Sequence, residues 1–190
     1  MKPRKDRRVE RTRAALIKAF NELFLTRRSG SIRVSDIVEH ANVGRSTFYE
    51  HYAGAADLRM QAMARPLAVL ADALTGQCGP DRLSGLLEHF RENRQRARAV
   101  FTGREGEQVT RLLAGMLEER LSGEGTEPAI PMRLAALQLA AASMAPIRGW
   151  VCAEGSCPPA RLAQTLCETS ALMRCGLFPK AEVASGAPDQ

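Results

Sequence analysis

The chain is poor in the features that mark membrane proteins and β-sheet proteins. Aromatic residues make up 5% of its 190 residues, and there is a single Trp. Runs of Val and Ile are absent while Ala and Leu are common, which favours helix over strand. The most apolar stretch, 135–146, has about twelve residues and is too short to span a bilayer. The composition therefore predicts an all-α protein without a membrane span.

A secretory signal and a cysteine framework are also missing. The N-terminal run MKPRKDRR is not followed by an apolar segment. The five cysteines are odd in number, form no CxxC pair and lie far in sequence from the three histidines, so a zinc site has little support. Cys167 and Cys175 can share one helix face. They are expected to be small buried residues, with a redox switch as the alternative.

Catalytic motifs are equally absent. The sequence has no Gly-rich phosphate loop, no GxSxG, no HExxH and no pair of carboxylates in a readable context. We therefore expect a protein that is not an enzyme and that holds neither a metal ion nor a cofactor.

What the chain does have is an uneven charge. Residues 1–53 hold 12 Lys and Arg against 6 Asp and Glu, so this segment alone accounts for the net charge of +6. Residues 54–190 are neutral overall. A basic segment joined to a neutral one is typical of a nucleic-acid-binding domain attached to a second domain, although a solvated basic tail would have the same composition.

The most informative pattern lies in residues 31–58. Apolar residues recur there at helical spacing: Ile32, Val34, Ile37, Val38 and Ala41. Asn42-Val43-Gly44 interrupts this helix with residues suited to a sharp turn. A second helix follows from Arg45 to about Tyr52, with Phe48 and Tyr52 four residues apart on its inner face. Two helices joined by a short turn predict a helix-turn-helix.

This stretch resembles the DNA-binding domain of the TetR family of transcriptional repressors. The residues that carry the resemblance are Ile37, Ala41-Asn42-Val43, Thr47-Phe48-Tyr49 and Tyr52, and it covers about residues 9–60. The chain departs from the family where Asn42 replaces a Gly, where Gly44 replaces a capping Ser, and where Arg33 replaces a capping Thr. The cap of that helix is therefore expected at Ser31. Ala55 replaces a Lys that usually meets a DNA phosphate, and the N–H groups at the start of that helix are the alternative contact for this phosphate.

The resemblance implies a cytoplasmic, all-α protein of two domains. Residues 1–53 would form a three-helix helix-turn-helix DNA-binding domain. The five basic residues among residues 1–8 predict, in addition, a disordered arm that follows the phosphate backbone or reaches into a minor groove. Residues 54–178 would form a helical effector-binding and dimerisation domain, and 179–190 a disordered tail. The expected helices are 9–25, 55–74, 81–91, 92–101, 105–121, 129–152 and 159–177, and Pro66 should kink or break the second of these.

The resemblance also implies partners. A palindromic operator in double-stranded DNA would be bound by a homodimer, in which helices 129–152 and 159–177 pair with their copies as a four-helix bundle. Packing of the same small residues within one chain is the alternative. The residues expected to contact DNA are Arg33, Ser35, Arg45, Ser46, Thr47, Tyr49, His51 and Tyr52.

Three positions have individual roles. Arg45 is the best candidate for a bidentate contact with guanine in the major groove, with a phosphate contact nearly as well supported. Tyr49 and His51 resemble the aromatic residue and the His with which the family contacts phosphates. Glu50 either accepts a hydrogen bond from a cytosine or points away.

The second domain should hold a pocket for an unknown small-molecule effector. Candidate wall residues are Met60, Met63, Phe90, Phe101, Met116, Met132, Met144 and Trp150, each of which is also explained as core. The sequence therefore indicates a ligand-responsive homodimeric repressor. The alternative is a helical interaction protein whose helix-turn-helix no longer reads DNA.

Overall fold

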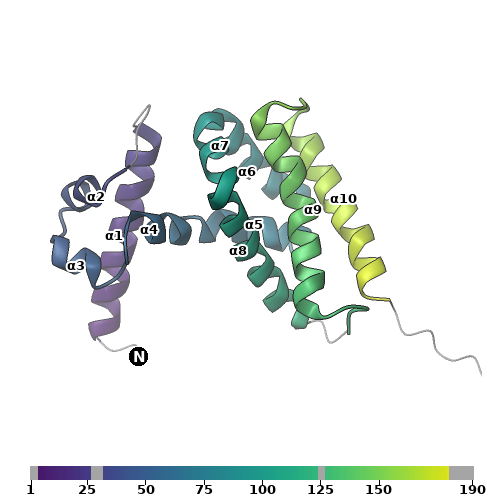
Figure 1. The fold of residues 1–190 in the computed structure, drawn as a ribbon, viewed down its shortest axis with the longest axis horizontal. Helices are drawn as coiled ribbons and strands as arrows, with labels where there is room; N and C mark the ends of the chain where they lie inside the picture. Colours follow the sequence, from purple (N-terminus) through teal and green to yellow (C-terminus); the bar gives the residue numbers. More distant parts are fainter. Residues whose placement is uncertain (1–3, 27–31, 124–126, 180–190) are drawn as a thin grey trace, which may run out of the picture. The chain divides into compact units, whose positions relative to one another are not determined.

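The chain folds into helices throughout the part that the structure describes. The computed structural model describes residues 4–26, 32–123 and 127–179, and in these ranges it contains ten α-helices and no β-strand (Figure 1). The expectation of an all-α fold is confirmed. None of these ten helices has both the length and the apolar character needed to cross a bilayer. Contacts group the chain into two compact units, Met1–Arg65 and Pro66–Gln190.

The first unit contains α1 (Arg4–Thr26), α2 (Val34–Ala41), α3 (Arg45–Tyr49) and α4 (Ala55–Ala62). Its core is built from apolar side chains of all four helices and of the turn after α3: Leu16, Ala19, Phe20, Ile37, Phe48, Tyr52 and Leu58. The helix α1 packs against both α2 and α4. The short helices α2 and α4 are therefore stabilised by burial against α1 rather than by their own length, and α3 packs on α2.

The expected disordered arm is partly wrong. Residues 4–8 belong to the start of α1, and residues 1–3 of the expected arm lie outside the described part of the chain. Lys and Arg are good helix formers, and Pro3 stands directly before the first helical residue, a place where proline is tolerated. Basic charge in this segment therefore does not prevent a helix.

The turn between α2 and α3 has the geometry that its sequence predicts. Asn42 adopts the left-handed conformation with φ 51°, and its N–H donates to the carbonyl of Glu39 at 3.1 Å. The N–H of Phe48 donates to the carbonyl of Gly44 at 3.0 Å, which starts α3. The helix is shorter than expected, since it ends at Tyr49 and a turn leads on to Tyr52.

The start of α2 is capped in a different way from the family pattern. The carboxylate of Asp36 accepts a hydrogen bond of 3.0 Å from the backbone N–H of Arg33. An acidic side chain in the first turn also opposes the positive end of the helix dipole. Asp36 thereby supplies part of the capping for which a Thr was expected, whereas Ser31 lies outside the described residues.

The expected helix over 55–74 is broken, as Pro66 predicts. Its two parts are α4 and α5 (Ala64–Leu74), with Met63 in a turn between them. Proline has no N–H to donate to the carbonyl four residues earlier, which here belongs to Ala62, the last residue of α4. Contacts place α4 with the first unit. The boundary between the two compact units thus lies after α4, between Arg65 and Pro66. The expected boundary after residue 53, which concerns the segment that folds on its own, stays a prediction.

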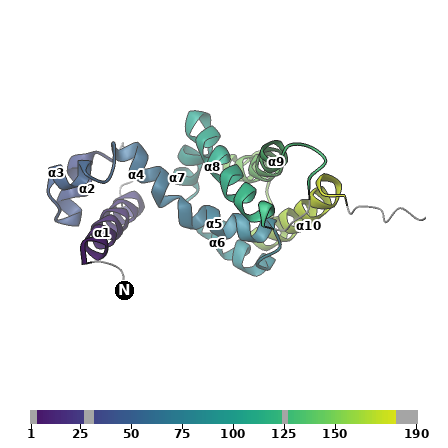
Figure 2. The same ribbon diagram turned by 90° about the horizontal axis from the view of Figure 1, so that it is seen from below.

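The second unit contains α5 and five further helices: α6 (Pro80–Glu92), α7 (Arg94–Phe101), α8 (Gly103–Ser122), α9 (Met132–Cys152) and α10 (Pro159–Leu177). The helix α9 packs on α8, and α10 packs on α6 (Figure 2). The predicted bounds of α10 are confirmed, because proline marks its start in the sequence. The helix α9 begins at Met132, three residues later than expected, directly after Pro131.

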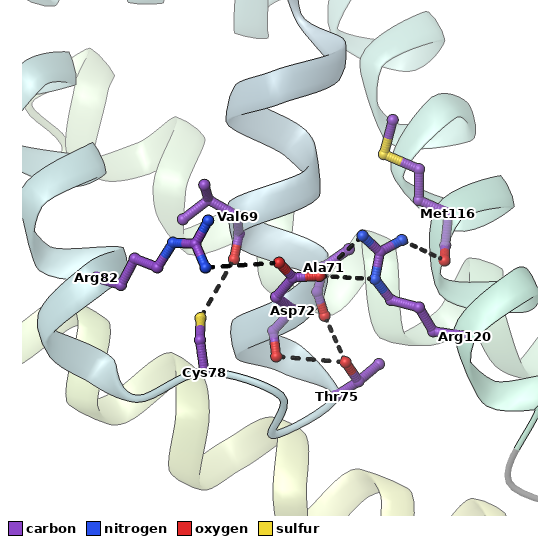
Figure 3. A network of polar contacts seen from close by, with 8 residues as sticks. All are labelled: Val69, Ala71, Asp72, Thr75, Cys78, Arg82, Met116 and Arg120. Atoms are coloured by element: carbon purple, nitrogen blue, oxygen red, sulfur yellow. Dashed lines mark hydrogen bonds and ion pairs between the residues drawn. The ribbon is translucent and has the colours of Figure 1, made fainter. Parts of the chain in front are cut away.

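A partly buried ion pair links three helices of this unit (Figure 3). In α5, the Oδ1 atom of Asp72 accepts from Nε of Arg120 in α8 at 2.9 Å and lies 2.8 Å from its Nη2. The Nη1 of Arg120 donates to the carbonyl of Met116 at 2.9 Å. Arg82 in α6 approaches the other carboxylate oxygen at 4.0 Å. The guanidinium of Arg120 thus joins α5 to α8 with most of its donors satisfied.

Candidate nucleic-acid interface

The helix α3 has one buried side and one exposed side. Phe48 is 0% exposed, and its ring centroid lies 5.6 Å from that of Tyr52, which is also in the core. Tyr49 is 50% exposed, and Arg45 and Ser46 are exposed beside it. The predicted inner face of Phe48 and Tyr52 is confirmed. The opposite face presents hydrogen-bonding side chains on a helix small enough for the major groove of DNA.

Aromatic contacts fix the position of the exposed ring. The rings of Phe48 and Tyr49 meet edge to face, with centroids 5.4 Å apart and planes at 86°. This is a favoured arrangement of two aromatic rings. The guanidinium carbon of Arg45 lies over the ring of Tyr49, 6.0 Å from its centroid. The buried Phe48 therefore positions the ring of Tyr49, and that ring in turn contacts the guanidinium of Arg45.

Other predicted DNA contacts lie around α3 on the first unit. Arg33 and Ser35 are exposed at the start of α2, while Thr47 and His51 are half-buried. The ring of His51 lies 6.5 Å from that of Tyr52, centroid to centroid. Arg33, Ser35, Thr47 and His51 each keep a surface that a ligand can reach, and their contacts with DNA stay predictions.

Tyr52 differs from the rest of the predicted set. It is 2% exposed, and its hydroxyl group is buried without a hydrogen-bond partner among the described residues. Burial raises the pKa of this hydroxyl above its usual range, and the nearby charge of Arg13 opposes the shift. Tyr52 presents no surface to a DNA molecule in this structure. We therefore assign it to the core and leave it out of the proposed interface.

A polar contact that the sequence did not indicate joins α1 to α2. Nε2 of His40 and Oε2 of Glu22 are 2.8 Å apart, and Lys18 lies 3.8 Å from the same carboxylate. The hydrogen bond with His40 is the main reason why the pKa of Glu22 lies below its usual value. Eighteen residues separate the partners in sequence. Only the hydrophobic faces of α1 and α2, which bring them together, hint at the contact.

The predicted pocket residues fall into different surroundings. Met60 and Met63 belong to the first unit and are half-buried. Phe90, Phe101, Met144 and Trp150 are core residues of the second unit. Met116 and Met132 are half-buried.

Two contacts fix the aromatic residues of that core. The rings of Phe90 and Phe101 meet with centroids 5.0 Å apart, and Nε1 of Trp150 donates to the carbonyl of Cys157 at 2.9 Å. Their assignment to an effector pocket remains a prediction. Over the described residues no cluster of three or more His, Cys, Asp or Glu side chains is placed to hold a metal ion.

Known proteins resemble this chain in part of the sequence and in the fold. No protein-family model matches the sequence. An uncharacterized HTH-type transcriptional regulator of Bacillus subtilis (strain 168), YxbF, is 40% identical over 80 residues, which are 42% of this chain. The match spans 21% of the length of YxbF.

Solved structures extend the likeness over most of the chain. The TetR family repressor AlkX of Dietzia sp. strain DQ12-45-1b has a TM-score of 0.58 at 18% identity, over 85% of this chain and 95% of AlkX. Thermus thermophilus FadR, a TetR-family repressor solved with lauroyl-CoA, has a TM-score of 0.52 at 18% identity, over 92% of this chain and 100% of FadR.

The fold and the exposed α3 define an all-helical protein with a helix-turn-helix in its first unit. More specifically, the chain has the fold of the TetR-family transcriptional regulators, and the resemblance that residues 31–58 indicated is confirmed.

Proposed function

We propose that the chain is a ligand-responsive homodimeric transcriptional repressor of the cytoplasm. It binds a palindromic operator through the helix-turn-helix and is released by a small-molecule effector. The observation that carries the proposal is the two-sided α3, in which Phe48 anchors the helix in the core while Arg45, Ser46 and Tyr49 face outward. A helix held in this way presents base-reading side chains in a fixed orientation.

The charge distribution supports a polyanionic partner. The net charge of +6 is confined to residues 1–53, the segment that carries α1, α2 and α3. Lys and Arg that neutralise phosphates release counterions, which makes such binding depend steeply on salt. Arg33, at the N-terminal end of α2, and Arg45, the first residue of α3, are both exposed. We assign phosphate or base contacts to these two side chains, together with Ser35, Ser46, Thr47, Tyr49 and His51.

The outer faces of α9 and α10 support a dimer. Leu134 and Leu172 are large apolar residues that are 52% and 73% exposed. Residues exposed at helical spacing extend each face: Gln138, Ala141 and Ala145 on α9, and Arg161, Thr165, Glu168 and Cys175 on α10. The small side chains of Ala141 and Ala145 allow a helix to approach α9 closely, which supports a four-helix bundle with a second copy. A two-fold protein matches a two-fold operator.

The effector is proposed to bind in the second unit. FadR, which has a similar fold, was solved with lauroyl-CoA, and this supports the capacity of the fold to hold a small molecule. Phe90, Phe101, Met116, Met132, Met144 and Trp150 are the side chains that we propose for the wall of the pocket.

The test is selection of duplexes from a random pool with the full chain, followed by gel shifts of the selected duplex and of a random duplex. We expect a palindromic consensus, and we expect log K to fall with log salt at about −0.9 per neutralised phosphate. Equal affinity for both duplexes would instead favour the interaction protein that no longer reads DNA. A flat salt response would remove the phosphate contacts from the proposal.

A further inference from the structure

The exposed face of α3 contains a contact between two side chains that are proposed to meet DNA. The guanidinium carbon of Arg45 lies over the ring of Tyr49 at 6.0 Å from its centroid. At this distance the negative face of the ring attracts the cation. In the part of the chain that the structure describes, Arg45 has no ion-pair partner. Tyr49 is thus the neighbour that biases the orientation of this long side chain.

The ring of Tyr49 is itself held in place by the core. Phe48 is 0% exposed and meets Tyr49 edge to face at 5.4 Å. Arg45 and Tyr49 are the first and last residues of α3, four positions apart, so their side chains share one face of the helix. A fixed series of contacts therefore runs from the buried Phe48 to the Tyr49 ring and then to the exposed guanidinium.

We propose that Tyr49 is a positioning residue for Arg45, and that its ring holds the guanidinium ready to read a guanine in the major groove. The inference rests on the proposed function and deepens it. A guanidinium that stacks on a ring keeps the N–H donors around its edge available for hydrogen bonds. Restricting a flexible side chain before binding also lowers the entropy lost when the complex forms. The Tyr49 hydroxyl remains free to meet a phosphate, so the ring and the hydroxyl have separate roles.

The experiment measures base preference with full-length protein and duplexes selected from a random pool. Tyr49→Leu removes the ring, Tyr49→Phe keeps it without the hydroxyl, and Arg45→Ala removes the cation. We expect Tyr49→Leu to reduce discrimination about two- to five-fold at the base pair whose preference Arg45→Ala abolishes. Tyr49→Phe should weaken binding to all duplexes alike and keep the base preference.

The double variant Arg45→Ala/Tyr49→Leu separates positioning from an independent contact. If the ring acts through Arg45, the double variant loses no more discrimination than Arg45→Ala alone. Additive losses, or a Tyr49→Leu variant that keeps its base preference, would overturn the positioning role while the proposed function stands. A wild-type protein that prefers no duplex would overturn the proposed function, and the positioning role with it.

A second readout needs no DNA. The ring current of Tyr49 should shift the NMR resonances of the Arg45 side chain in the free protein. We expect that shift to persist in Tyr49→Phe and to disappear in Tyr49→Leu. Arg45 resonances that do not change in Tyr49→Leu would overturn the contact itself, whatever the DNA measurements give.

Discussion

Neighbouring residues of α3 have opposite environments, and this division decides what each substitution does. Phe48 is 0% exposed and contacts the rings of both Tyr49 and Tyr52. Tyr49, one position later, is half-exposed. A change at the first position therefore acts on folding, and a change at the second acts on the surface. A five-residue helix depends on its buried anchor because it is too short to be stable alone.

Phe48→Ala tests this anchor. We expect it to destabilise the first unit by about 3–5 kcal/mol, because it removes a buried ring from a small core. Urea unfolding followed by the NMR signals of α1 and α2 measures the loss. Tyr49→Ala is the matched control and should change the unfolding free energy by less than about 1 kcal/mol, since half of that ring is already in water. Equal losses of unfolding free energy in the two variants would contradict the assignment of Phe48 as the buried anchor of α3.

Gly106 tests a close approach in the second unit. A Cβ atom at this position would lie 2.3 Å from the carbonyl oxygen of Phe101, so Gly106→Ala forces the backbone between α7 and α8 to move. We expect a loss of stability of about 1–3 kcal/mol in thermal or urea unfolding. Gly85→Ala, in the exposed middle of α6 with no atom near its Cβ, should stabilise by about 0.5–1 kcal/mol. A Gly106→Ala variant with unchanged stability would mean that the backbone between α7 and α8 adjusts to the added methyl group without cost.

At the scale of elements, we expect the link between α1 and α2 to depend on pH. The pKa of Glu22 is below its ordinary value of 4.5 in the folded chain, chiefly through the hydrogen bond with His40. A carboxylate with a lowered folded pKa contributes stability above its unfolded pKa, and that contribution is lost as the pH falls through the folded pKa. We expect the unfolding free energies of wild type and Glu22→Gln to differ near pH 6 and to converge as the pH falls below 4.5 and through the lowered folded pKa of Glu22. A difference that stays constant with pH would exclude this carboxylate as the cause.

The break between α4 and α5 is the second feature at this scale. Pro66→Ala restores an N–H that can donate to the carbonyl of Ala62, so α4 and α5 should join through Met63. Slower amide hydrogen exchange at residues 63–66 would show that the two helices have become continuous. We propose that the break takes part in release from DNA, with a purely structural role as the alternative. If it takes part, Pro66→Ala lowers the ratio of DNA affinities without and with effector; an unchanged ratio assigns Pro66 a structural role alone.

At the scale of the whole molecule, the proposed assembly depends on the outer faces of α9 and α10. Leu172 is 73% exposed on α10, in the face where a second copy is proposed to pack. Leu172→Glu places a charge in the proposed interface and should convert the dimer to a monomer. Light scattering after gel filtration measures the mass.

The control for this change is Gln108→Glu, which adds the same charge at an exposed position of α8. It should leave the mass unchanged. A wild-type chain that is monomeric at micromolar concentration, or a Leu172→Glu variant that stays dimeric, would contradict an interface at this face. Loss of operator binding together with the dimer would link the assembly to DNA recognition.

The sequence by itself determined most of the helices, though not all of their ends, and the turn that defines the motif. Helical spacing of apolar residues, the left-handed Asn42 and the proline at the start of α10 are local features, so their consequences are readable from neighbouring residues. The break near Pro66 follows from a missing donor four residues from its acceptor. The resemblance to TetR-family proteins rests on the same local spacing.

Only the tertiary structure decided what each helix face meets. Spacing placed Phe48 and Tyr52 on one face, but the packing of α1 and α4 buried the hydroxyl of Tyr52 and removed it from the DNA-facing surface. The contacts Glu22–His40 and Asp72–Arg120 join residues 18 and 48 positions apart. Helical periodicity fixes the direction of a side chain around its own axis. The partner that the side chain meets depends on how separate helices pack, and no local pattern encodes that.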